Sequence, residues 1–474
     1  MLILRILFTQ MKPVRMGCVA FLFATLSMLG ACSDDANNGG NGPVPSPTPQ
    51  PQLRIITSYA GAEGADIADI WKTDGTEAGT VLIKRIATAP RQASLVIGYT
   101  EYKGAYYFTL NDNINGYELW RTDGTADGTV LFKDINVTPG ASGGSDPYGF
   151  KVFNGTLYFT ASNAVNGRAI WKTDGTVEGT VPVRTVNVES DFVEFQGALY
   201  FQGRLNSSGA ELWRTDGTTE GTVLVEDINS VLGESSYPSG LTVFEDRLYF
   251  AANDGVNGPE LWKSDGTAEG TVLVRDINPD ANSFYQPQEL TVFNDALYFR
   301  ANVGVQNERR YRLWKTNGTA ETTVPVGDIN PVELREFKGA LYFRADATAA
   351  QLWKTDGTAE GAVLVKEINP TTGSDYMFFK FYNGVLYFGA DDGVNGRELW
   401  RSDGTTDGTF MVKNINPAPE SAPFPGSNPE GLSIVNNVLT FLANGGANGR
   451  GLWKTDGTSD GTVLLEPLNY FGSS

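Results

Sequence analysis

The chain repeats one short sequence pattern, and each copy contains a tryptophan. The copy at 118–125 reads ELWRTDGT, and the copy at 260–267 reads ELWKSDGT. All nine tryptophans of the chain stand at this position of the pattern: Trp71, Trp120, Trp171, Trp213, Trp262, Trp314, Trp353, Trp400 and Trp453. The shortest interval, Trp314 to Trp353, is 39 residues, and the longest, Trp400 to Trp453, is 53. A repeat of this length with β-rich content predicts propeller blades rather than a helical solenoid.

Each repeat reads as four short strands, rich in Val, Leu, Phe, Tyr and Thr. In the repeat around Trp262 they are expected at 240–244, 247–253, 260–265 and 271–277. Leu261 and Trp262 are adjacent, so on a strand they point to opposite faces of the sheet. Both are large and apolar, which predicts a sheet buried on both faces, as a blade is between its neighbours.

The DGT segment after each tryptophan has a local explanation. An aspartate side chain accepts hydrogen bonds from backbone N–H groups of a turn, and glycine supplies positive φ. The aspartates of this series are Asp74, Asp123, Asp174, Asp216, Asp265, Asp356, Asp403 and Asp456, with Asn317 in the sixth repeat. Since a catalytic carboxylate has no reason to recur around a ring, we expect these residues to be structural.

The sequence therefore predicts an all-β fold, a β-propeller of four-stranded antiparallel blades built from nine repeat units. The second, third and fourth strands occur nine times, but no first strand precedes 53–60. Either nine blades close with one strand missing, or eight full blades close and the first unit packs irregularly, or the array stays open. We favour one closed ring of eight or nine blades, because closure removes exposed sheet edges.

The N-terminal region has the features of a bacterial lipoprotein signal. Basic residues at 12 and 15 precede an apolar run at 18–29, which fits residues 1–31 as a signal peptide. The segment Leu29–Cys32, LGAC, resembles the lipobox of bacterial lipoproteins. That resemblance implies lipidation of Cys32, a membrane anchor, and, because Ser33 follows, transfer to the outer membrane. Residues 32–52, rich in Gly, Asn and Pro, then form a flexible tether, and 53–474 form the propeller domain.

The repeats over 53–468 resemble the bacterial ELWxxDGT repeat family. The resemblance implies a propeller-type secreted or surface protein of largely unassigned function. We therefore expect a location in the bacterial cell envelope, lipid-anchored, and either periplasmic or surface-exposed.

Composition excludes several functional classes. The chain has no histidine, and its formal net charge is −19. Histidine is the commonest general base and transition-metal ligand, and an acidic surface repels nucleic acid. Helical periodicity is absent around the G-x-S-x-G segments at 140–144 and 457–461, so neither reads as a nucleophile elbow, and the sequence has no phosphate-binding glycine loop. These absences lead to the expectation that the protein is not an enzyme and binds no nucleic acid.

Ligand binding is expected on the long connections between the fourth strand of one repeat and the first strand of the next. Variable loops on a fixed scaffold are the usual place for binding, and aromatic side chains there can stack on a sugar or hold a protein. The candidate residues are Tyr148, Tyr237, Phe284, Tyr285, Tyr376 and Phe424.

Calcium is a second candidate ligand. The segments NDNING (111–116), NDGVNG (253–258) and DDGVNG (391–396) resemble the start of a calcium loop. The third position is glycine in two of them, and the bidentate glutamate is missing at its proper spacing. We therefore predict no metal site and no cofactor, with Ca²⁺ left open.

The function predicted from the sequence is a lipid-anchored envelope propeller that acts as a non-enzymatic binding or structural module. The alternatives are a secreted glycan-binding or glycan-active propeller and a passive acidic surface-coat protein. The expected partners are the membrane, through the lipid, and an envelope protein or a glycan. The sequence leaves the oligomeric state open.

Overall fold

The structure is a computed structural model that divides into two units, Met1–Gln50 and Pro51–Ser474. It describes residues 54–59, 66–88, 97–137, 143–165, 167–205, 209–280, 283–304, 310–345, 350–358, 360–369, 379–417 and 426–468. The predicted signal peptide, the tether and Cys32 lie outside these residues, as do Tyr376 and Phe424. Within the described ranges, no helix is long and apolar enough to cross a membrane.

The strands of the second unit form nine sheets. The first four contain β1 Arg54–Tyr59, β2 Asp66–Thr73 and β3 Val81–Thr88; β4 Ile97–Tyr102, β5 Ala105–Asn111, β6 Tyr117–Thr122 and β7 Val130–Lys133; β8 Tyr148–Phe153, β9 Thr156–Asn163, β10 Gly167–Thr173 and β11 Val181–Thr185; and β12 Asn187–Val188, β13 Val193–Phe195, β14 Ala198–Arg204, β15 Glu211–Thr215 and β16 Val223–Glu226. The other five contain β17 Ser239–Phe244, β18 Arg247–Asn253, β19 Pro259–Ser264 and β20 Val272–Arg275; β21 Gln288–Phe293, β22 Ala296–Asn302, β23 Tyr311–Thr316 and β24 Val324–Pro325; β25 Pro331–Phe337, β26 Ala340–Ala345, β27 Ala350–Thr355 and β28 Val363–Asn369; β29 Lys380–Tyr382, β30 Val385–Asp391, β31 Arg397–Ser402 and β32 Phe410–Lys413; and β33 Glu430–Val435, β34 Val438–Asn444, β35 Arg450–Thr455 and β36 Val463–Pro467.

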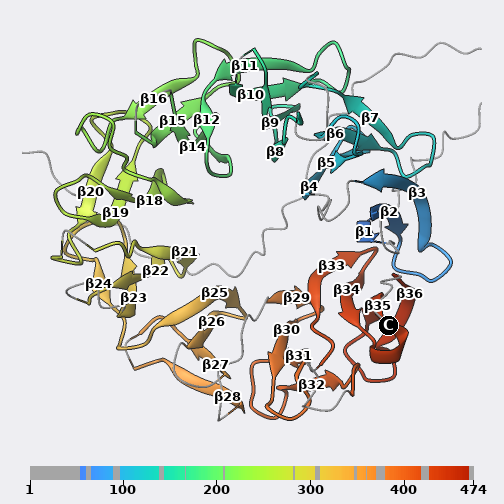
Figure 1. The fold of residues 1–474 in the computed structure, drawn as a ribbon. Coiled ribbons are helices and arrows are strands. Elements are labelled where there is room, and N and C mark those ends of the chain that lie inside the picture. The colour runs from blue at the N-terminus through green and yellow to red at the C-terminus, as the bar shows by residue number, and fades with distance from the viewer. Residues whose placement is uncertain are drawn as a thin grey trace, which may run out of the picture. The chain divides into compact units, whose positions relative to one another are not determined.

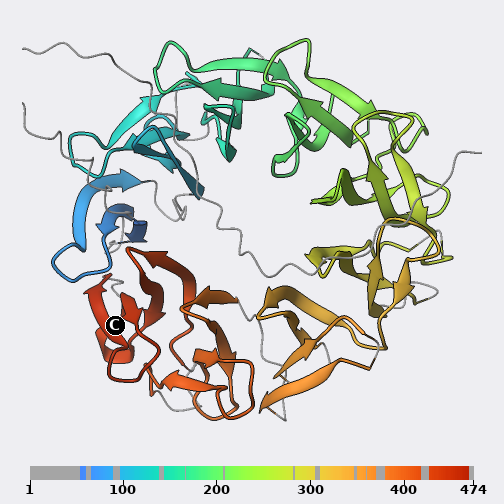
Figure 2. The same cartoon turned by 180° about the vertical axis from the view of Figure 1, so that it is seen from behind.

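The second unit is a β-propeller, as the repeats predict. Its sheets are antiparallel and follow one another around a ring (Figure 1). In the four-stranded sheets the first strand lies toward the middle of the ring and the fourth on the outside, which the reverse view in Figure 2 also shows. In the fourth sheet the first strand is divided into β12 and β13, and both pair with β14. The only helical element in the described ranges is the 3-10 turn η1, Gly446–Asn448.

The ring closes with nine sheets, of which the first has three strands. In that sheet β1 pairs with β2 over all six of its residues, so β1 corresponds to the second strand of the other blades. The last blade contacts the first: Asn436 Nδ2 donates to Asp74 O at 3.1 Å. Trp71 packs against an apolar cluster of the last blade that contains Leu452, Leu465 and Leu468. Of the three arrangements left open by the sequence, the structure shows nine blades closed with one strand missing.

Apolar side chains from both faces of each blade form the junctions between blades. Leu119 packs toward the third blade, against Phe159 and Trp171. Its neighbour Trp120 packs toward the first blade, against Ile70 and Ile83. The described residues contain nine such clusters, and each holds one of the nine tryptophans. The indoles therefore lie inside the blade junctions, and the prediction that both faces of a blade are buried is confirmed.

The DGT turn also takes part in the junction. Asp265 Oδ1 accepts hydrogen bonds from Thr267 N at 3.0 Å and Thr267 Oγ1 at 2.7 Å, and the Thr267 hydroxyl lowers the pKa of Asp265. The turn glycine of the next repeat, Gly318 at φ +99°, lies against the tyrosine of a strand in the preceding blade. A Cβ on Gly318 would lie 2.2 Å from the Tyr249 hydroxyl oxygen. The turn therefore requires glycine both for its φ and for the contact between blades.

A change in one indole tests the junctions. Trp120 is 6% exposed, and replacing it with alanine leaves a cavity between the first two blades, so Trp120→Ala should lower the free energy of unfolding by about 3–5 kcal/mol. Ile114→Ala, in the same blade but 72% exposed, is the matched control and should change it by less than about 0.5 kcal/mol. Denaturant titration measures both. A loss below about 1 kcal/mol for Trp120→Ala would mean that the indole does not hold the junction.

Candidate functional site

Three of the predicted aromatic residues meet at one pocket. Tyr237, from the connection before β17, and Phe284 and Tyr285, from the connection before β21, line a pocket of about 780 Å³. Tyr237 is 56% exposed and Phe284 is 83% exposed. Their side chains are therefore available to contact a ligand, and two exposed aromatic rings at one pocket are typical of an interaction site. We call this the loop pocket.

Polar side chains complete the loop pocket. Asn229, Asn253, Gln286 and Gln288 line it together with Tyr311 of β23. Tyr285 and Tyr311 meet edge to face with ring centroids 6.1 Å apart. Carboxamides donate and accept hydrogen bonds, so the pocket combines an aromatic wall with neutral groups of both polarities. A pocket of this size with a few convergent polar groups is typical of ligand sites.

A buried glutamate fixes the connection that carries Tyr237. Glu211, which precedes the Leu-Trp pair of the fourth repeat, accepts hydrogen bonds from Ser236 N at 2.8 Å and from Ile228 N at 3.0 Å. Its other hydrogen bond comes from the Ser236 hydroxyl. Since both ends of the connection attach to one carboxylate, the backbone at Tyr237 is held in a left-handed conformation at φ +50°. The aromatic ring thus projects from a fixed base.

The same arrangement recurs at other long connections. Glu118 binds Ile135 N and the Ser145 hydroxyl, and Glu398 binds Ile415 N and the Ser427 hydroxyl. Glu260 accepts a hydrogen bond from Asn278 N at 2.7 Å, at the start of the connection to Phe284. This role of the glutamates was not predicted from the sequence. The sequence did contain an indication of it: four repeats have glutamate directly before the Leu-Trp pair, and each of these four repeats is followed by a long connection.

The other predicted aromatic residues do not share the pocket. The Tyr148 hydroxyl donates to Val188 O, and the Arg168 guanidinium lies 4.7 Å from the centre of its ring. Tyr148 therefore links the third blade to the fourth. Tyr376 and Phe424 lie outside the described residues.

The segments that resemble calcium loops form closed turns. Asp254 Oδ1 accepts hydrogen bonds from Val256 N at 2.9 Å and Asn257 N at 2.7 Å, and its Oδ2 accepts one from Asn257 Nδ2 at 2.7 Å. Asp112 and Asp392 make the same contacts in their own turns. These carboxylates face N–H donors of the turn itself. The described residues contain no cluster of three or more metal-binding side chains.

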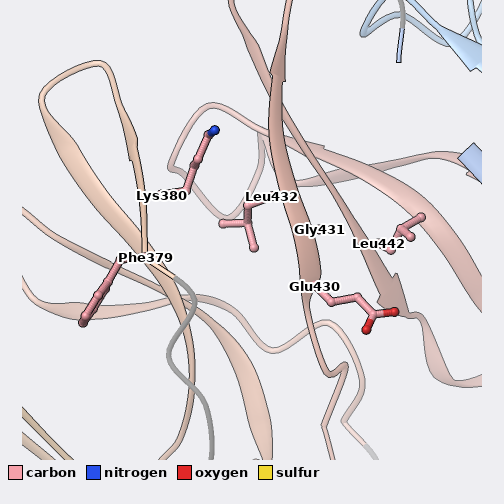
Figure 3. A pocket seen from close by; sticks show the side chains of 6 residues that line it. All are labelled: Phe379, Lys380, Glu430, Gly431, Leu432 and Leu442. Atoms are coloured by element: carbon pink, nitrogen blue, oxygen red, sulfur yellow. The ribbon is translucent and has the colours of Figure 1, made fainter. Parts of the chain in front are cut away.

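A second pocket, of about 520 Å³, lies between the last two blades (Figure 3). Phe379 and Lys380 reach it from the start of β29, Leu432 from β33 and Leu442 from β34. Its walls are mainly aliphatic, and the Glu430 carboxylate is paired with Arg450. With few free polar groups, this pocket offers less for specific recognition than the loop pocket.

Comparison with known proteins finds likeness in structure alone. No family model and no curated protein matches the chain. Solved structures that match include one from a study of two prolyl endopeptidases, with 9% identity, 74% of this chain and 54% of that chain covered, and a TM-score of 0.41. Prolyl oligopeptidase B from Galerina marginata matches with 13% identity, coverage of 74% and 55%, and a TM-score of 0.42. A puromycin-hydrolyzing peptidase from Mycobacterium tuberculosis matches with 9% identity, coverage of 77% and 59%, and a TM-score of 0.38.

These matches correct the function predicted from the sequence. That prediction was a non-enzymatic binding or structural module, with a glycan propeller or a passive coat as alternatives, and no enzyme. The matched structures belong to peptidases, so the prediction is withdrawn. The chain spans between 54% and 59% of the length of the three matched chains. At these identities the likeness concerns the fold, and it brings no residue or activity of those enzymes to this chain.

The buried glutamates predict that stability falls as pH rises above about 4.5. Burial raises the pKa of Glu118 to about 7 and that of Glu260 to about 8, from an ordinary 4.5. Burial also raises the pKa of Glu211 and Glu398. Between pH 4.5 and about 8 the folded state binds more protons than the unfolded state, so the free energy of unfolding decreases with pH. Aspartates such as Asp265, whose pKa values are lowered, change the free energy of unfolding with pH only near and below pH 3.8.

Thermal unfolding at pH 5 and pH 8 checks this, and we expect the lower melting temperature at pH 8. Glu260→Gln should reduce the difference between the two melting temperatures. The exposed Glu269→Gln controls for the loss of one negative charge. Equal melting temperatures of the unmodified protein at pH 5 and pH 8 would contradict the prediction.

Proposed function

We propose that the propeller recognises peptide substrates for cleavage, and that the loop pocket holds an extended, proline-containing segment of the peptide. The observation that carries the proposal is the convergence of Tyr237, Phe284, Tyr285 and Tyr311 on one pocket with neutral carboxamides around them.

The rings favour proline. A proline-rich segment is extended before it binds, loses little entropy on binding, and packs its flat ring faces on aromatic side chains. Tyr237 and Phe284 come from two consecutive connections and are largely exposed. Tyr311 is buried and forms the inner part of the wall. Rings at two levels provide surfaces for more than one residue of a peptide.

The amides favour a peptide backbone. Asn229 and Asn253 stand near Tyr237 in the lining, and Gln286 and Gln288 stand near Tyr285. Asn229 holds its own connection, because its Nδ2 donates to Ser235 O and its Oδ1 accepts from Val231 N. The Nδ2 of Asn253, the Nε2 of Gln288 and the carboxamide of Gln286 can bond to the backbone of a bound peptide. An extended peptide has no internal partners for its backbone N–H and C=O groups, so these carboxamides can serve as their hydrogen-bond partners.

The charge favours neutral or basic peptides. Glu234 is the charged residue that lines the loop pocket, and the formal net charge of the chain is −19. The field of such a protein attracts cationic partners and repels anionic ones. The three matched structures are of peptidases, one from a study of prolyl endopeptidases; the pocket, and not that likeness, supports the proposal.

Removing the exposed rings should weaken peptide binding without unfolding the protein. Tyr237→Ala combined with Phe284→Ala should raise the Kd for a fluorescent proline-rich peptide at least tenfold, since each ring contributes about 1 kcal/mol or more to such a contact. The melting temperature should change by less than about 2 °C, because both side chains are exposed. Fluorescence anisotropy and thermal unfolding measure the two effects.

Tyr99→Ala is the control for the loss of an exposed ring. Tyr99 is 41% exposed and lies in the second blade, outside the loop pocket. It should leave the Kd unchanged. Binding of glycans but not of peptides by the unmodified protein would overturn the proposal.

We also propose that the protein acts at a membrane of the bacterial envelope, held by a lipid on Cys32. The support is the sequence LGAC at 29–32 after an apolar run. In cells labelled with an alkyne fatty acid, the unmodified protein should carry the label and pellet with membranes. Cys32→Ser should lose the label and appear in the soluble fraction, whereas Cys18→Ser should not. Equal labelling of the Cys32→Ser protein would exclude this anchor.

A further inference from the structure

The two faces of the ring differ in their exposed apolar side chains. The connections between blades and the turns between second and third strands lie at the same end of the strands, and we call this end of the ring the loop face. Among the described residues, nine large apolar side chains are more than half exposed, and all nine lie on the loop face. They are Ile114, Val137, Val165, Val231, Leu232, Tyr237, Val256, Phe284 and Val394.

The opposite face has polar turns. Its hairpins contain pairs such as Lys103-Gly104 and Asn154-Gly155, and its other turns are the DGT segments. The most exposed large apolar side chain on the described part of these turns is Val177, at 44%. Single exposed apolar residues are normal on a soluble protein. Their concentration on one face of a symmetric ring indicates an interaction surface.

Four of the nine occupy the same place in the turn between the second and third strands, and they are between 70% and 87% exposed. We call them the turn tips: Ile114, Val165, Val256 and Val394. Three of these turns are the segments that resemble calcium loops, in which an aspartate binds the backbone of the tip. Asp112 Oδ1 accepts from Ile114 N at 3.0 Å, and Asp392 Oδ1 accepts from Val394 N at 3.0 Å. The turn is thus held through the backbone of the tip, and the fold makes little use of the apolar side chain.

The turn tips are spread around the ring. Their strand pairs, β5 and β6, β9 and β10, β18 and β19, and β30 and β31, stand at separate points of the circle (Figure 1). Equivalent positions of blades around one axis lie at about the same height along it. A protein partner usually covers one continuous patch of about 800 Å². Separate apolar tips in one plane instead match a flat and fluid surface, the boundary between the headgroups and the acyl chains of a bilayer.

The chain that precedes the propeller brings a bilayer within reach. A tether of the length predicted at 32–52 spans about 25 Å on average. A lipid on Cys32, as proposed above, keeps the turn tips at a high effective concentration near the membrane, so that a few weak contacts are enough. The formal net charge of −19 favours lipids without net charge, because anionic headgroups repel an acidic protein.

We propose that the loop face docks on a bilayer of zwitterionic lipid, with the turn tips inserted among the headgroups. The choice of a bilayer rests on the proposed lipid anchor, and the inference goes beyond the proposed recognition of peptides. The loop pocket lies on the same face, since Val231 and Gly255 line it. Docking therefore places the loop pocket at the membrane surface, and the peptides that it meets are segments close to the bilayer.

A fluorescent probe on one turn tip tests the inference. In the full chain with Cys18→Ser and Cys32→Ser, Val256→Cys supplies the single thiol for an environment-sensitive fluorophore. Phosphatidylcholine vesicles should shift its emission to the blue, and bromine atoms on the acyl chains should quench it, because the probe leaves water. The same probe at Val177→Cys, on the opposite face, should show neither change.

Replacing the other turn tips should weaken docking. Ile114→Thr, Val165→Thr and Val394→Thr together should raise the lipid concentration for half of the blue shift at least about tenfold, since three side chains lose apolar surface. The melting temperature should change by less than about 2 °C, because the tips are exposed. The matched control carries the same change at three exposed valines of fourth strands and should keep the original lipid concentration: Val130→Thr, Val272→Thr and Val463→Thr. The apolar run at 18–29 is identical in all variants, so differences between them report the propeller.

Three results would overturn the inference. The first is an unchanged emission of the probe at position 256 with vesicles. The second is an equal shift of the probe at position 177, which means adsorption without orientation. The third is a blue shift at position 256 that grows with protein concentration in the absence of lipid, which assigns the loop face to a second copy of the chain. Peptide binding without vesicles and the fatty-acid label on Cys32 are measured separately, so the proposed function does not fail with this inference.

Discussion

The packing of each blade against two neighbours is the interaction on which this structure depends. A single four-stranded sheet with Leu119 on one face and Trp120 on the other cannot exist alone in water, because both faces are apolar. The repeat supplies identical partners on both sides, and closure supplies them for the first and last blades. At six junctions the turn glycine lies against a tyrosine of the preceding blade, and this contact then sets how closely the two blades approach. The connections held by buried glutamates and the loop pocket that they form both depend on this packing between blades.

The sequence predicted what repetition and local chemistry decide. The adjacent Leu261 and Trp262 pointed to sheets buried on both faces, and they do lie in different junctions. The turn aspartates accept hydrogen bonds as expected. The exception is Asn317, whose side-chain oxygen accepts from the hydroxyl of Thr322. The number of blades was left open because closure depends on contacts between residues such as Asp74 and Asn436, far apart in the chain.

The candidate site was predictable only in part. Tyr237, Phe284 and Tyr285 were chosen as aromatic residues on long connections, and these three share a pocket, whereas Tyr148 links two blades. Buried glutamates anchor both connections, but Tyr237 directly follows the anchored Ser236, whereas Tyr148 comes three residues after the anchored Ser145 and lies on the strand itself. That difference depends on contacts with Glu211 and Glu118 that are distant in sequence, so the aromatic pattern alone does not show it. Six inner strands shift register at a residue with positive φ, which is glycine in four blades but Glu289 in β21 and Glu333 in β25. This difference could have been found from the sequence. Aligning the repeats with one another shows such departures, and in a symmetric scaffold they mark the positions that symmetry does not explain.

The three-stranded first sheet makes the ring unequal in its resistance to local opening. In a closed ring a blade cannot leave without breaking two junctions, so partial unfolding of an ordinary blade is strongly opposed. At the junction of the last and first blades, Trp71 packs against Leu452, Leu465 and Leu468. Separation at this junction divides no continuous part of the chain, because the first and last blades are not consecutive in the sequence. We therefore expect the amide protons of β1, β2 and β36 to exchange with solvent before those of the other blades. The junction between the last and first blades separates before the propeller unfolds as a whole.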